Sequence, residues 1–128
     1  MDVLNIEKQI EYWINTAKSD LDTAELLIRE SRLIHGLFFC HLAIEKGLKA
    51  HVVKDTGNIP PKSHNLIYLL DLSNIEFGES FEDFLGILMK YQLEGRYPDY
   101  NPVIPVKDKV FEYLNKTKEI LIWIERKL

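Results

Sequence analysis

The stretch from residue 34 to residue 54 constrains the fold most, because apolar side chains cover nearly its whole circumference when it is drawn as a helix. A helix that is apolar all round must be buried on several sides. Ala43, Gly47 and Ala50 fall on one side of it, so a neighbouring helix can approach closely there. A glycine in mid-helix costs about 1 kcal/mol relative to alanine, which close packing has to offset. We therefore expect this helix to lie centrally, with at least one neighbour at short range.

Two further helices are predicted on either side of this segment. Residues 6–30 carry apolar side chains at three- and four-residue steps and charged side chains on the other face, which is typical of an amphipathic helix. After the turn residues 57–62, Ser63 is placed to cap a short helix over residues 66–70. His64 then falls in the first turn of that short helix.

The last part of the chain predicts two more helices. Ser80 begins a pattern that resembles a capping box, and the apolar residues after it continue to about Leu93. Pro105 is well placed to begin the final helix. Because no segment shows sustained period-two alternation, the sequence predicts an all-α, up-and-down bundle of three long and two short helices. A length of 128 residues corresponds to one domain, residues 1–128.

Composition narrows the class of protein. Hydrophobic residues make up 46% of the chain and charged residues 28%, which describes a soluble globular protein. No apolar run approaches the roughly 20 residues that a membrane-spanning helix needs. The N-terminal residues lack the basic start and apolar centre of a signal peptide, so we expect a cytoplasmic protein.

The cysteine, the histidines and the net charge exclude some kinds of site. Cys40 is the single cysteine and lies in an apolar stretch, so it is expected to be a buried core residue. The four histidines are scattered without the spacing of metal ligands, and no cofactor is expected. The net charge of −4 gives no overall attraction to nucleic acid, so binding of that kind requires a local basic patch.

The segment from Leu93 to Pro102 is where the sequence points most clearly to function. It is rich in polar and aromatic residues, and Pro98 and Pro102 push the residues before them out of the α region. Arg96, Asp99 and the tyrosines Tyr97 and Tyr100 therefore sit on a constrained connection. Gly, Pro, Asn and Asp are also ordinary loop residues, so a solvated loop is the alternative.

A second group of polar residues lies within the apolar helix itself. His41, Glu45, Lys46 and Lys49 stand among its apolar side chains, and Glu45 and Lys49 have the favourable i,i+4 order. Asp20 lies next to the apolar stripe of the first helix, where a carboxylate is more often paired and partly buried. Three roles are open for these charged side chains: they form structural ion pairs, they line a charged interface between two subunits, or they face a ligand.

Four segments of the chain form a pattern in order and spacing: Ala17-Lys18-Ser19-Asp20-Leu21-Asp22-Thr23-Ala24-Glu25-Leu26-Leu27, Ala43-Ile44-Glu45-Lys46-Gly47-Leu48-Lys49-Ala50, Gly57 through Pro60 to Ser63-His64-Asn65-Leu66, and Arg96-Tyr97-Pro98-Asp99. Together they resemble the HEPN domain family (higher eukaryote and prokaryote nucleotide-binding). The resemblance spans most of the chain and implies a helical bundle that dimerises with its long helices near the subunit interface. The apolar second helix leads to the same expectation, since a lone domain would leave part of it exposed and a twofold partner would cover that part.

Many HEPN domains resemble metal-independent ribonucleases in which an arginine is followed, four to six residues later, by a histidine. Arg96 matches the arginine, but the positions four to six residues beyond it are Tyr100, Asn101 and Pro102, and no histidine follows Arg96. A general acid or base with a pKa near neutrality is therefore missing from that place. His64 and His41 are the candidates to replace it through folding or dimerisation. Arg96 and His64 are thus the candidate catalytic residues, although a non-catalytic protein is favoured.

The resemblance also implies two functions without catalysis. Some HEPN domains act with a minimal nucleotidyltransferase encoded as a separate chain, in toxin–antitoxin-type pairs, and some are adenylylated on a tyrosine by that partner. Tyr97 and Tyr100 are the candidate acceptors here. A plain nucleotide-binding dimer instead requires only a basic, aromatic cleft, in which lysines and Arg96 neutralise phosphate and Tyr97 stacks on a base. The predicted nucleotide- or RNA-binding residues are Arg96, Tyr97, Asp99, Lys46, Lys49, Glu45 and Asp20.

Overall fold

A computed structural model describes residues 2–128 of the chain. Within them the secondary structure consists of five helices: α1 (Val3–Arg29), α2 (Leu33–Thr56), α3 (Leu66–Leu72), α4 (Glu79–Met89) and α5 (Lys107–Arg126). No strand occurs among the described residues. The prediction of an all-α fold with three long and two short helices is confirmed.

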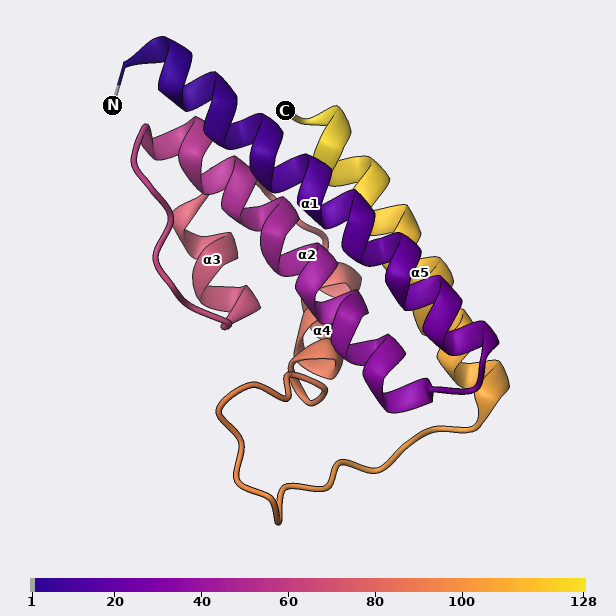
Figure 1. Ribbon diagram of the computed structural model, residues 1–128. Coiled ribbons are helices and arrows are strands. Elements are labelled where there is room, and N and C mark those ends of the chain that lie inside the picture. Colours follow the sequence, from indigo (N-terminus) through magenta and orange to yellow (C-terminus); the bar gives the residue numbers. More distant parts are fainter. Residues whose placement is uncertain (1) are drawn as a thin grey trace.

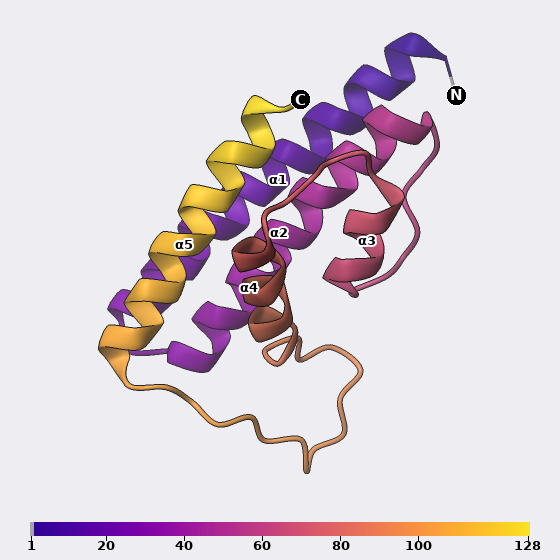
Figure 2. The same cartoon turned by 180° about the vertical axis from the view of Figure 1, so that it is seen from behind.

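Helix α2 lies at the centre of the bundle. It packs against each of the other four helices, and α1 also packs against α5. In Figure 1 the three long helices run side by side, and Figure 2 shows α3 and α4 on the side of α2 that faces away from α1. None of the helices in the described part of the chain is long and apolar enough to cross a membrane.

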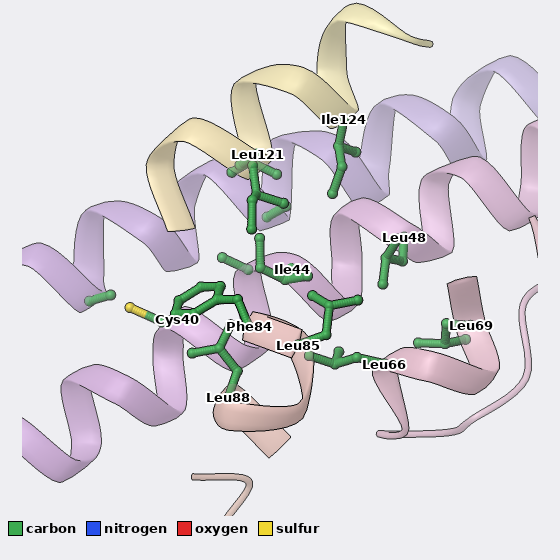
Figure 3. Packing of buried hydrophobic residues seen from close by; sticks show 14 of the residues in the cluster. Cys40, Ile44, Leu48, Leu66, Leu69, Phe84, Leu85, Leu88, Leu121 and Ile124 are labelled. Carbon is green, nitrogen blue, oxygen red and sulfur yellow. The ribbon is translucent and has the colours of Figure 1, made fainter. Parts of the chain in front are cut away.

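The core is built from aliphatic side chains of α2 and the helices around it. Figure 3 shows Ile44 and Leu48 of α2 between residues of α4, α3 and α5. Gly47 allows α5 to approach closely, because a Cβ atom there would lie 3.0 Å from Leu121 Cδ1. The predicted short-range packing at Gly47 is thus confirmed. Cys40 is buried as predicted, and burial raises the pKa of its thiol to about 12.

Most of the apolar circumference of α2 is covered within one chain. Of its residues, Leu37, Ile44, Leu48 and Val53 are fully buried by the surrounding helices. Phe38, Phe39 and Leu42 stay partly exposed, although four helices pack against α2. A homodimer stays a prediction.

Helix α3 begins at Leu66 as predicted, but its cap and the starts of α4 and α5 differ from the predictions. Asn65, not Ser63, caps α3: its side chain accepts from the backbone N–H of Tyr68, so His64 lies before the helix. Helix α4 begins at Glu79, so Ser80 is inside its first turn instead of capping it. Helix α5 begins two residues after Pro105. Of these three helices, only α3 has a side-chain cap in residues 2–128; Gly78 and Val106 precede α4 and α5 and make no side-chain cap hydrogen bond.

Candidate functional site

The candidate site lies on the connection between α4 and α5, residues 90–106, which we call the Arg96 loop. Figure 1 shows this segment leaving the bundle after α4 and returning at the start of α5. The Arg96 guanidinium is held by three contacts. Nε donates to the carbonyl oxygen of Gln92 at 3.1 Å, Nη2 donates to the carbonyl oxygen of Met89 at 3.5 Å, and the group lies 4.1 Å from the centre of the Tyr100 ring. Arg96 is nevertheless exposed, and no carboxylate in residues 2–128 forms a salt bridge with it. Its remaining N–H groups are therefore available to a ligand.

The residues around Arg96 line a shallow surface hollow of about 500 Å³. Tyr97 is 82% exposed, whereas Tyr100 is half-buried and its hydroxyl donates to the carbonyl oxygen of Lys90. A guanidinium held over one ring beside a second, exposed ring offers donors to a phosphate and a face on which a base can stack. The structure thus brings together the predicted residues Arg96, Tyr97 and Asp99. The lining residues of this Arg96 hollow are Gly95, Arg96, Tyr97, Asp99, Tyr100 and Asn101.

The charged residues of α2 do not line this hollow. Lys46 Nζ lies 2.7 Å from Asp20 Oδ2 of α1, and both side chains are largely buried. Lys49 Nζ donates to Glu45 Oε2 at 3.0 Å and lies 5.3 Å from the centre of the Trp13 ring. Within one chain these are structural ion pairs, one of the alternatives from the sequence. The single cleft expected from Arg96 and the two lysines does not form in one chain, and a role for Asp20, Glu45, Lys46 and Lys49 in ligand binding stays a prediction.

His64 lies between two carboxylates. Its Nδ1 is 2.9 Å from Glu45 Oε1, and its Nε2 is 3.1 Å from Glu94 Oε2. Because carboxylates only accept hydrogen bonds, Nδ1 donates to Glu45, and Nε2 can donate to a second anion only in a ring that carries both protons. Glu94 precedes Arg96 by two residues, so His64, which lies between α2 and α3, is tied directly to the Arg96 loop.

His41 supports this arrangement from inside the core. It is fully buried, and its Nε2 donates to the backbone carbonyl oxygen of His64 at 3.0 Å. Burial lowers the pKa of His41 to about 4, an effect larger than the opposite one of the Glu45 carboxylate, whose Oε1 lies 3.7 Å from His41 Nδ1. His41 is therefore neutral at physiological pH and holds the backbone of His64 in place.

The sequence profile of the HEPN domain matches residues 10–127. The chain belongs to the HEPN domain family. Comparison with curated proteins finds no match.

Two solved structures resemble this HEPN domain. The protein TT1696 from Thermus thermophilus gives a TM-score of 0.80 at 24% sequence identity, covering 94% of this chain and 98% of that one. ST0689, an archaeal HEPN homologue, gives a TM-score of 0.63 at 21% identity, covering 92% of this chain and 96% of that one. At these identities the likeness establishes the fold alone.

Sequence reasoning did not single out Glu94 and Trp13 in this HEPN domain. Glu94 stands two residues before Arg96, but its contact with His64 depends on the path of an irregular loop, which no periodicity predicts. Trp13 was expected only as an apolar residue of the first helix, yet its ring also faces the Lys49 ammonium. No group of three or more His, Cys, Asp or Glu side chains in residues 2–128 is arranged to hold a metal ion.

Proposed function

We propose that this protein is a cytoplasmic HEPN-type homodimer that binds nucleotide or RNA through the Arg96 loop and works with a minimal nucleotidyltransferase partner. The observation that carries the binding proposal is the exposed Arg96 guanidinium, which has no carboxylate partner in residues 2–128 and lies in one hollow with Tyr97. Charge-assisted hydrogen bonds from arginine are well suited to phosphate oxygens, and an exposed tyrosine ring can stack on any base. The net charge of −4 makes such a local site necessary for an anionic ligand.

Removal of the Arg96 side chain tests this proposal. Arg96→Ala should weaken binding of AMP or of a short single-stranded RNA by about 1.5–3 kcal/mol, or roughly one to two orders of magnitude in Kd. Titration calorimetry measures the affinity, and circular dichroism checks that the helices are intact. Arg126→Ala is the matched control, because it removes the same charge near the C-terminal end of α5. Equal affinity of the parent and Arg96→Ala would remove Arg96 from the site.

The nucleotidyltransferase partner is proposed from the HEPN resemblance. If the partner transfers AMP to this chain, Tyr97 is the better acceptor, since its side chain is 82% exposed while the Tyr100 hydroxyl already donates to Lys90. A minimal nucleotidyltransferase in the neighbouring reading frame would support the pairing. Intact-mass measurement after co-expression should then show added AMP that Tyr97→Phe abolishes. An unmodified mass would count against modification and favour a plain nucleotide-binding dimer.

Homodimerisation is proposed from the same resemblance and from apolar residues left exposed on the Arg96 loop. Val103 is 87% and Val106 is 76% exposed, and a second subunit would offer these side chains a partner surface. Light scattering after size exclusion should give twice the mass of the 15.0 kDa chain. A clean monomer at micromolar concentration would contradict the dimer.

A metal-independent ribonuclease is the second candidate, favoured by the contact between His64 and the Arg96 loop. His64 Nε2 lies 3.1 Å from Glu94, and Glu45 orients the ring from its other side, as a carboxylate orients a catalytic histidine. Labelled RNA incubated with the protein in EDTA distinguishes the two functions. Cleavage that both Arg96→Ala and His64→Ala abolish would establish the ribonuclease, whereas intact RNA leaves binding as the function.

A further inference from the structure

The two carboxylates that contact His64 differ in how firmly they are held. The Glu45 side chain is 4% exposed and accepts from His64 through Oε1 and from Lys49 through Oε2, so both of its oxygens are engaged. The Glu94 side chain is 58% exposed, and His64 is its one polar partner in the described part of the chain. Glu45 is therefore the permanent partner of Nδ1. Glu94 is a partner that another anion can replace.

The place that Glu94 occupies lies beside the proposed phosphate site. Only Gly95 separates Glu94 from Arg96, so the Cα atoms of these two residues are at most about 7 Å apart. A phosphate oxygen is anionic like a carboxylate oxygen and accepts a hydrogen bond from the same N–H donor. A phosphate that reaches the Arg96 loop can therefore take the place of the Glu94 carboxylate, whose Oε2 lies 3.1 Å from His64 Nε2.

We propose that His64 Nε2 is a second donor to the phosphate of the bound nucleotide or RNA, and that Glu94 occupies the phosphate's place in the free protein. This inference rests on the proposed function of the Arg96 loop. Glu45 acts as a positioning residue, because its bond to Nδ1 turns Nε2 toward the loop. His41 positions the same residue through its backbone carbonyl.

The expected effect of removing the Glu94 carboxylate is small but measurable. An exposed ion pair contributes little, so the ligand displaces Glu94 easily and the free carboxylate weakens binding only modestly. Glu94→Gln should therefore tighten binding of a phosphate-bearing ligand about two- to fivefold. Loss of the His64 donor should weaken the same binding.

The experiment measures the anisotropy of a fluorescein-labelled short single-stranded RNA at one fixed salt concentration, because phosphate binding depends strongly on salt. Asp99→Asn removes the same charge from the lining of the Arg96 hollow, and since Asp99 has no contact with His64 among residues 2–128, it measures the effect of a carboxylate at this site apart from His64. The gain in RNA affinity from Glu94→Gln should exceed the gain from Asp99→Asn. This difference should vanish when His64 is also changed to Ala. If His64→Ala fails to fold by circular dichroism, His64→Phe, which fills the space without a donor, replaces it.

Each outcome bears on the proposal. Equal gains from Glu94→Gln and Asp99→Asn, or an excess that persists without His64, would overturn it. If binding responds to Arg96→Ala but never to the Glu94–His64 pair, this inference fails while the proposed function stands. RNA binding by neither the parent nor Glu94→Gln would overturn both.

Discussion

Replacement of Glu45 by glutamine is expected to destabilise the protein by about 3 kcal/mol, because Lys49 is left as a buried ammonium without its counter-ion. Glu45 is 3% exposed and Lys49 6%, and their charged atoms lie 3.0 Å apart. Breaking such a pair from one side typically costs about 3–5 kcal/mol. The lower end applies here, since the new amide oxygen still accepts from Lys49 and the Trp13 ring lies 5.3 Å from the ammonium.

Substitution of Lys49, alone and together with Glu45, separates the energy of the ion pair from the cost of burying each charged group. Lys49→Met should cost less, about 2 kcal/mol, because Glu45 retains the hydrogen bond from His64 Nδ1 at 2.9 Å. The double variant contains neither charge, so its loss should be about 2 kcal/mol smaller than the sum of the two single losses.

Urea unfolding with linear extrapolation measures these free energies of unfolding. The control is the pair of Lys18 and Glu125, whose charged atoms lie 2.9 Å apart but whose side chains are 52% and 44% exposed. Its double-mutant cycle should give a coupling below about 1 kcal/mol. Additive losses for Glu45 and Lys49, or a coupling no larger than that of the control, would refute the reasoning from burial.

Three further predictions concern stability. Acidification from pH 6.5 to 4 should destabilise the protein by about 3 kcal/mol through His41, because the unfolded imidazole has a pKa near 6.5 whereas burial lowers the folded pKa to about 4. The stability that the neutral His41 contributes is therefore present above pH 6.5 and is lost as the pH falls toward 4. His41→Asn should flatten the pH dependence of the free energy of unfolding in urea. Gly86→Ala should stabilise α4 by roughly 0.5–1 kcal/mol, since nothing lies within 4 Å of the added methyl group. Gly36→Ala should destabilise by roughly 1–2 kcal/mol, since its methyl group would lie 2.4 Å from Ile28 Cγ1; equal thermal shifts for the two glycine variants would contradict this.

The number of helices and their relative lengths could be predicted because packing against a core repeats every three to four residues. This periodicity is visible in the sequence without knowing which residues pack together. A helix with apolar side chains all round is expected at the centre of the bundle, which is where α2 lies. The capping residue at the start of a helix was harder to predict from the sequence. Ser63 and Asn65 both suit a cap, and only the hydrogen bond from Tyr68 N–H identifies Asn65.

The site was predictable where its residues are neighbours in sequence, as Arg96, Tyr97 and Asp99 are. Pairing between distant segments was not. Asp20 was expected to have a partner, but the registry of α1 against α2 selects Lys46. The contact of His64 with Glu94 joins two irregular connections, whose paths depend on turns and prolines instead of a repeating pattern.

The enclosure of α2 by four helices divides the site into two parts with different tolerance to mutation. Glu45 belongs to the most densely packed helix, where most substitutions also lower stability, so random mutagenesis should rarely recover viable changes there. Glu94, Arg96 and Tyr97 are exposed on a loop outside the core, where substitutions leave packing intact. Substitutions in the Arg96 loop can therefore change ligand preference during evolution, while Glu45, which orients His64 from the core, is kept by the requirements of folding.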